Sequence, residues 1–191
     1  MNSSTNITLP PATLNEQSGD AQYLTFLINN EMFAINILGV KEIIEYGNIT
    51  PIPMMPSFIR GVINLRGSVV SVVDLSARFG SAPSTITRRS CIVIIEGMPP
   101  QGDEPAGQDI GVVVDSVSEV LGIPPSDIEP PPSFGAKIRA DFISGMGKVN
   151  GKFVILIDTE KVLSLEEMAQ LNEITQPQAR LSQSNSNLQL S

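Results

Sequence analysis

Short apolar segments separated by turn residues follow one another through most of the chain and predict a mainly β fold. Many of these segments are rich in Val and Ile, whose β-branched side chains fit the pleated surface of a strand. The regular alternation of strand and helix patterns that indicates a parallel α/β sheet is missing from the sequence. We therefore expect short strands assembled into barrels or a sandwich.

Several of these segments are paired by their turn residues. Two apolar runs flank residues 29–31, and two others flank the Asn-Gly dipeptide at 150–151, which is typical of a type I′ turn. Both pairs are predicted to be β-hairpins. The longer stretch "GVINLRGSVVSVVDL", residues 61–75, is expected to be a strand pair or a bent strand broken at Gly67.

The segment "VKEIIEY", residues 40–46, mixes charged and apolar side chains. Strand alternation puts Val40, Glu42 and Ile44 on one face and the residues between them on the other. A strand buried on one side would carry a cleaner pattern. We therefore expect this strand to expose its polar residues along an edge or a groove.

The two ends of the chain differ from its centre. Residues 1–20 and 175–191 are polar and aperiodic, which predicts flexible tails around an ordered region at 21–174. That region is expected to end in a helix, because Ser164 and Glu167 form a capping box and apolar side chains follow at helical spacing.

Composition narrows the classes of function. The net charge of −8 disfavours binding to nucleic acid or to anionic lipid. The sequence contains no histidine, which removes Ser-His-Asp and Cys-His nucleophile systems and most zinc sites. Cys91 lies in an apolar run and is expected to be a buried thiol in a reducing compartment. With no export signal and no membrane-spanning run, the predicted location is cytoplasmic, without direct membrane insertion.

Three apolar runs end in an aspartate, at Asp74, Asp115 and Asp158. One interpretation is a carboxylate cluster that holds Mg²⁺ or accepts phosphate, as in a phosphatase. The favoured interpretation is structural: each aspartate ends a strand and caps the turn or short helix that follows it.

Arg66 poses a second alternative. It interrupts an apolar run between Gly61 and Gly67, which are expected to form bends. Arg66 could form an exposed ion pair, which contributes about 0–1 kcal/mol. It could instead be held at a fixed angle as a contact for a partner, since arginine is enriched among the residues that dominate binding. Local physics leaves both interpretations open.

A resemblance to a known family bears on this choice. The run P-x-F-I-x-G-V-I-N-L-R-G followed by VVDL, with "GVVVDSVSEVLGI" and "FISGMGKVNGKFVILIDTEKVL" after it, resembles the CheW-like domains of bacterial chemotaxis over about residues 21–174. The resemblance implies two small five-stranded SH3-like β-barrels that share a core, with a boundary near residues 85–90 and a C-terminal helix. Ser71, where relatives often have proline, and the acidic loop at 97–108 depart from the family pattern.

The resemblance also implies a function and a set of contacts. It implies a non-enzymatic adaptor, without cofactor, that couples methyl-accepting chemoreceptors to a CheA-type histidine kinase in arrays at the inner face of the membrane. An adaptor of a non-flagellar system, for example one controlling pilus motility, is the alternative. The positions implied to contact receptor or kinase are Val40, Glu42, Gly61, Asn64, Arg66 and Phe134.

Overall fold

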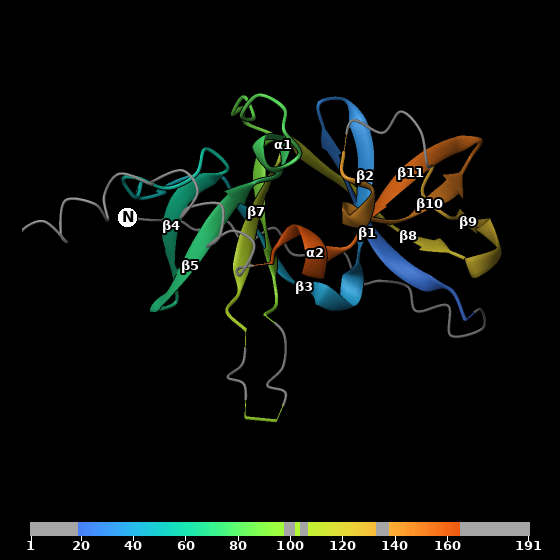
Figure 1. Ribbon diagram of the computed structural model, residues 1–191, viewed down its shortest axis with the longest axis horizontal. Helices are drawn as coiled ribbons and strands as arrows, with labels where there is room; N and C mark the ends of the chain where they lie inside the picture. Colours follow the sequence, from blue (N-terminus) through green and yellow to red (C-terminus); the bar gives the residue numbers. More distant parts are fainter. Residues whose placement is uncertain (1–18, 98–101, 104–106, 133–137, 165–191) are drawn as a thin grey trace, which may run out of the picture.

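A computed structural model of the chain describes residues 19–97, 102–103, 107–132 and 138–164. The predicted tails other than residues 19–20, the predicted helix after Ser164, and Phe134 lie outside these residues. Within the described ranges the chain folds into two β-sheets that lie side by side (Figure 1). The mainly β expectation is therefore confirmed, and the helices among the described residues are short.

The first sheet has six strands in the order β8-β1-β2-β11-β10-β9. Its strands are β1 (Ala21–Ile28), β2 (Glu31–Asn36), β8 (Ser116–Ile123), β9 (Ile128–Glu129), β10 (Ile143–Val149) and β11 (Lys152–Ile157). Strands β2 and β11 are parallel, and the other neighbours are antiparallel. Both predicted hairpins are present. Their turn residues Asn29, Asn30, Asn150 and Gly151 all have positive φ, as a type I′ turn requires.

The second sheet has five strands in the order β3-β6-β7-β5-β4. Its strands are β3 (Val40–Glu45), β4 (Ile59–Leu65), β5 (Ser68–Asp74), β6 (Cys91–Ile95) and β7 (Ile110–Val114). The chain leaves β3 at one edge of the sheet, and Thr50 then pairs with Val62 on β4 at the other edge. This bridge joins the two edges and closes the sheet into a small barrel.

The chain passes between the sheets twice, through the short helix η1 (Ile37–Gly39) and at Asp115. The boundary expected near residues 85–90 falls between β5 and β6, which belong to the same sheet. The first sheet contains both the opening and the closing strands of the chain because β2 pairs with β11. The remaining helices are α1 (Leu75–Arg78), η2 (Pro125–Asp127), η3 (Ala140–Phe142) and α2 (Thr159–Val162). Within the described part of the chain, no helix combines the length and the hydropathy needed to cross a bilayer.

The core has four parts, and the smallest of them contains Phe58, Val73 and Ile110. A shared core draws residues from both sheets and from the helices: Leu24, Phe26, Ile28, Phe33, Ile35, Ile43, Leu75, Cys91, Val93, Ile95, Val112, Val114, Phe142, Ile157 and Val162. A second-sheet core contains Ile63, Val70, Val72, Ile92, Ile94 and Val113. A first-sheet core contains Ala34, Ile123, Val154 and Leu156. Each barrel thus has an interior of its own, and the shared core joins the two. Cys91 is buried there as a free thiol, and burial raises its pKa.

A buried arginine reinforces the junction between the sheets. Arg78, at the end of α1, lies over the rings of Phe58 and Phe142, 5.1 and 4.7 Å from their centroids. Its Nε donates to the carbonyl of Val162 in α2, at 3.0 Å. The guanidinium therefore links α1, which follows β5 of the second sheet, to α2, which follows β11 of the first.

Candidate protein-interaction site

Strand β3 lies at the edge of the second sheet, as the mixed pattern of residues 40–46 predicted. The prediction that Val40 shares a face of the strand with Glu42 was wrong. Val40 pairs with Ile95 and Glu42 with Ile94, so Lys41 is an extra residue in a β-bulge. The bulge shifts the alternation. Val40 packs against the shared core, whereas Glu42 lies on the opposite face of the strand.

Arg66 is on a turn and not on a strand, which corrects part of the expectation for residues 61–75. Arg66 and Gly67 have φ values of 51° and 88°, and they join β4 to β5 as a two-residue hairpin turn. The Oδ1 of Asn64 accepts a hydrogen bond from the Gly67 N–H at 2.8 Å, which holds the turn. The strand-pair alternative was therefore the right one, with the arginine at its tip.

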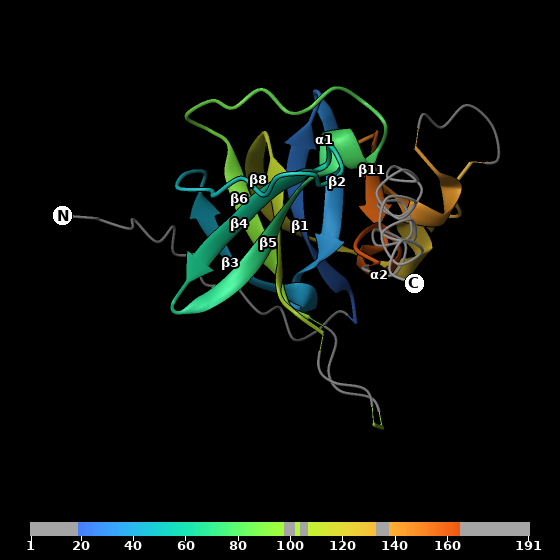
Figure 2. The same ribbon diagram turned by 60° about the vertical axis from the view of Figure 1, so that its left-hand side comes forward.

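An ion pair joins the tip of the β4–β5 hairpin to β3, two elements drawn as ribbons in Figure 2. The Nη2 of Arg66 lies 2.8 Å from the Oε2 of Glu42, while 66% of the Arg66 side chain is exposed and only 15% of that of Glu42. The Oε1 of Glu42 is buried and has no hydrogen-bond partner among the described residues. The pair thus combines an accessible cation with a carboxylate that is largely covered.

Gly61 has a different role from its neighbours. It is buried, with φ of 142°, and a Cβ atom built on it would lie 2.1 Å from the carbonyl oxygen of Thr50. That same carbonyl accepts a hydrogen bond from the N–H of Val62 at 2.9 Å. Glycine at this position therefore allows the barrel to close. The role of Gly61 in this geometry is structural, in the closure of the barrel. It has no side chain to contact a partner.

The predicted contact residues are partly brought together. Glu42, Asn64 and Arg66 lie at the junction of the β4–β5 hairpin with β3. Val40 faces the shared core and Gly61 lies in the barrel wall. Phe134 lies outside the described residues, so its predicted contact stays a prediction.

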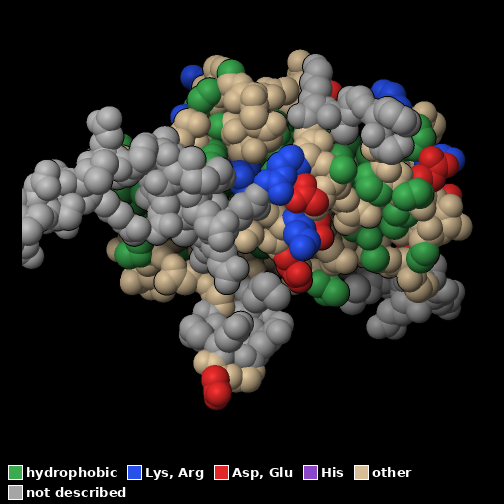
Figure 3. Space-filling view, viewed as in Figure 1, with side chains coloured by type: hydrophobic (Ala, Val, Ile, Leu, Met, Phe, Trp, Pro, Cys, Tyr) green, Lys and Arg blue, Asp and Glu red, His purple; other side chains and the backbone are tan. Residues whose placement is uncertain are grey.

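Sequence reasoning missed Val69, which lies directly opposite Asn64 on the hairpin. Its side chain is 70% exposed, which is unusual for valine in a strand. A two-residue turn at Arg66 and Gly67 pairs Val69 with Asn64. Because Asn64 is polar, this pairing indicates that the Val69 side chain lies on the solvent-facing side of the hairpin. Apolar, basic and acidic side chains also occur on the face drawn in Figure 3, so exposed apolar groups are not confined to this hairpin.

The three aspartates that end apolar runs form structural hydrogen bonds. Asp74 and Asp158 cap α1 and α2, as the favoured interpretation predicted. Asp115 was predicted as a cap but instead accepts from the N–H of Asn29 at 2.7 Å, because another strand and not a helix follows it. Among the described residues, no group of three Asp, Glu, Cys or His side chains is placed to hold a metal ion.

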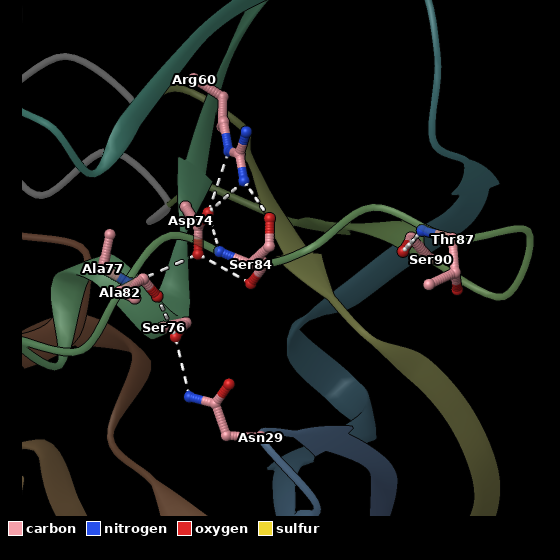
Figure 4. A network of polar contacts seen from close by, with 9 residues as sticks. All are labelled: Asn29, Arg60, Asp74, Ser76, Ala77, Ala82, Ser84, Thr87 and Ser90. Carbon is pink, nitrogen blue, oxygen red and sulfur yellow. Dashed lines mark hydrogen bonds and ion pairs between the residues drawn. The ribbon is translucent and has the colours of Figure 1, made fainter.

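Asp74 is the centre of a buried network (Figure 4). Its two carboxylate oxygens accept from the backbone N–H groups of Ala77 and Ser84, from the Ser84 hydroxyl and from the guanidinium of Arg60. These bonds tie β4, β5 and α1 to the segment around Ser84. Every oxygen of this fully buried carboxylate is therefore engaged in holding the fold.

A second ion pair lies beside Glu42. The Nζ of Lys41 donates to the Oδ2 of Asp109 at 2.7 Å, and Oδ1 of Asp109 accepts from the N–H of Gly97 at 3.1 Å. The bond from Lys41, followed by that from Gly97, lowers the pKa of the Asp109 carboxyl, and the bond to Asp109 raises the pKa of Lys41.

We expect this pair to be visible in a titration. The carboxyl carbon of Asp109, followed by NMR, should titrate below the ordinary value for aspartate, and Lys41→Met should raise that midpoint. Because the folded-state pKa is lowered, the contribution of the pair to stability is present above the unfolded-state pKa. It is lost as the pH falls through the folded-state pKa. A midpoint that did not move in Lys41→Met would contradict the assigned bond.

The sequence of the chain matches that of a known protein family. A model of the CheW-like domain matches residues 22–167. A chemotaxis protein CheW of Klebsiella aerogenes is 34% identical over 85% of this chain and 95% of its own length. A CheW of Rhizobium meliloti is 31% identical over 78% of this chain and 92% of its own.

One further relative and one solved structure are also similar to this chain. The protein FrzA of Myxococcus xanthus is 28% identical over 75% of this chain and 86% of its own length. The crystal structure of the scaffolding protein TtCheW of Thermoanaerobacter tengcongensis superposes with a TM-score of 0.68, at 33% identity over 78% of this chain and 90% of that one. The two joined barrels and the matches over most of the chain lead to one conclusion: the chain belongs to the CheW-like domain family of chemotaxis scaffold proteins.

Proposed function

We propose that this scaffold couples methyl-accepting chemoreceptors to a CheA-type histidine kinase, in arrays at the cytoplasmic face of the membrane. It does so by binding and not by catalysis. The observation that carries the proposal is the Arg66–Glu42 pair, which presents an exposed guanidinium on a two-residue turn beside an edge strand. The CheW-like family supplies the class of function, and this junction supplies a surface fit for a protein partner.

The physics of the junction suits a binding surface. An arginine on a flexible loop loses side-chain and backbone freedom when it binds, but the two-residue turn already restricts the backbone of Arg66. The guanidinium offers N–H donors beyond the one that faces Glu42. Val69 adds an exposed apolar side chain on the same hairpin, across from Asn64. A partner can therefore bury an apolar group while a carboxylate or carbonyl of that partner accepts from Arg66.

Replacing Arg66 with alanine tests this proposal. The ion pair is exposed on the arginine side, so the free energy of unfolding should fall by less than about 1 kcal/mol. Loss of an anchoring arginine from an interface typically costs about 2 kcal/mol or more, roughly thirtyfold in affinity. We expect the variant to be folded but to recover far less kinase and receptor in a pull-down from its native cells.

The control is Arg88→Ala, which removes another exposed arginine, in the segment between α1 and β6. It should recover both partners like the unaltered protein. If Arg66→Ala captured kinase and receptor as well as Arg88→Ala does, the role assigned to the junction would be wrong.

The same pull-down identifies the pathway. The similarity to FrzA, beside that to the chemotaxis CheW proteins, supports a second candidate: an adaptor of a non-flagellar chemosensory system. Both candidates use the same fold and the same surface. The kinase and receptors recovered, identified by mass spectrometry, separate the two.

A further inference from the structure

We propose that the Lys41–Asp109 ion pair positions Glu42 for partner binding by holding the β-bulge at Lys41. The inference rests on the proposed function of the Arg66–Glu42 junction and assigns a new role to two residues outside it. Neither residue needs to touch the partner. They act by holding the bulge that places the Glu42 carboxylate on the Arg66 side of β3.

The bulge is what brings Glu42 to Arg66. In a regular strand Val40 and Glu42 would share a face, because side chains alternate with a period of two. Here Val40 packs against the shared core, to which Ile43 also belongs. Ile44 packs instead against the second-sheet core, on the face that Glu42 shares. Without the extra residue, either Val40 would leave the core or Glu42 would turn away from the hairpin tip.

The contact with Asp109 pins this bulge from outside the strand. Strand β6 lies between β3 and β7, so the Lys41 side chain reaches across the end of β6 to the residue that precedes β7. Asp109 is itself anchored by the N–H of Gly97, the second residue after β6. The backbone there is closely packed, since a Cβ on Gly97 would lie 2.0 Å from the Gly107 carbonyl oxygen. Lys41 is thus tied to a fixed point of the sheet.

The other irregular pairings of the fold support a structural function for this contact. In the second sheet the extra residue is Arg60, whose guanidinium binds Asp74. In the first sheet the hydroxyl of Ser144 donates to the Leu156 carbonyl, and Thr25 exchanges hydrogen bonds with the backbone of Glu119. At each register shift a polar side chain holds the irregularity in place. Lys41 follows the same rule, and its bulge is the one next to the binding junction.

The test uses the whole chain and three single variants, with Glu42→Gln and Arg66→Ala as references for the signals. Lys41→Met keeps the length of the side chain but removes its charge, and Lys41→Arg retains the ability to bind Asp109. Lys148→Met is the matched control, because Lys148 also pairs with an exposed carboxylate, that of Glu129, but in a regular stretch of strand pairing. Each variant is measured by NMR at the Glu42 carboxyl carbon and the Arg66 Nε–H, and by pull-down of the kinase and receptor.

We expect Lys41→Met to shift the Glu42 carboxyl signal toward its position in Arg66→Ala, and the Arg66 Nε–H signal toward its position in Glu42→Gln. It should also reduce partner capture about two- to fivefold. Lys41→Arg should restore the signals and the capture, and Lys148→Met should change neither. Unchanged Glu42 and Arg66 signals in Lys41→Met would overturn the inference, as would capture no weaker than that of Lys148→Met. Undiminished capture by Arg66→Ala would overturn the proposed function instead, so the two failures are distinct.

Discussion

Gly61→Ala is expected to destabilise the protein by about 2–4 kcal/mol, more than any exposed substitution in the junction. The added Cβ would meet the Thr50 carbonyl at 2.1 Å, and its carbon and the Ile49 side chain at 2.8 and 2.9 Å. Backbone atoms cannot step aside as the end of a long side chain can. The bridge between Thr50 and Val62 must open, and with it the closure of the second barrel.

The measurement is urea unfolding of the full-length chain, with Gly67→Ala as the control. Gly67 also has positive φ, at 88°, but an added Cβ there would meet nothing within 4 Å. Gly67→Ala therefore reports the cost of a positive φ without a collision, about 1 kcal/mol. The difference between the variants reports the collision together with the less favourable backbone of Gly61, whose φ is 142°. Equal losses in the two variants would show that the Thr50 contact is not what requires glycine.

This result would also change how partner binding is interpreted. Loss of binding in a Gly61 variant would come from a distorted barrel edge, since the added Cβ would displace Ile49 and Thr50, which follow β3 in the chain. Loss in Arg66→Ala would come from the missing guanidinium in a stable fold. The unfolding free energy separates the two causes.

Asp74→Ala is expected to cost about 3–5 kcal/mol, the range for breaking a buried charge pair. The substitution removes the acceptor for Arg60, for the Ala77 and Ser84 N–H groups and for the Ser84 hydroxyl. Several donors would lose their partner at once in a site closed to solvent, and each buried unsatisfied group carries a penalty. The segment around Ser84 should detach first, because these bonds hold it to β5.

Asp158→Ala is the matched control for Asp74→Ala. Asp158 caps α2 in the same way, through the N–H of Lys161 at 3.1 Å, but it is only partly buried. Its loss should cost about 1 kcal/mol, the usual value of an N-cap. Thermal or urea unfolding of both variants gives the comparison. Similar losses at the two positions would mean that Asp74 acts as a cap and that the network around it contributes little.

Local sequence signals determined much of the architecture. Asparagine and glycine tolerate positive φ, so residue types located the turn at 150–151, and the turn predicted at 29–31 lies at 29–30. Runs of Val and Ile with few helix patterns indicated a mainly β fold, and the structure confirms it. The mixed alternation of residues 40–46 correctly predicted an edge strand, because an edge tolerates charged side chains.

Only the tertiary structure decided which side chains of the candidate site come together. Strand periodicity assigned Val40 and Glu42 to one face, but a single inserted residue, held by a carboxylate far along the chain, put them on opposite faces. The sequence predicted a bend at Gly61, but the close approach of the Thr50 carbonyl, which requires glycine there, became visible only in the folded barrel. Bulges, barrel closure and buried networks depend on atoms distant in sequence, so local patterns do not contain them.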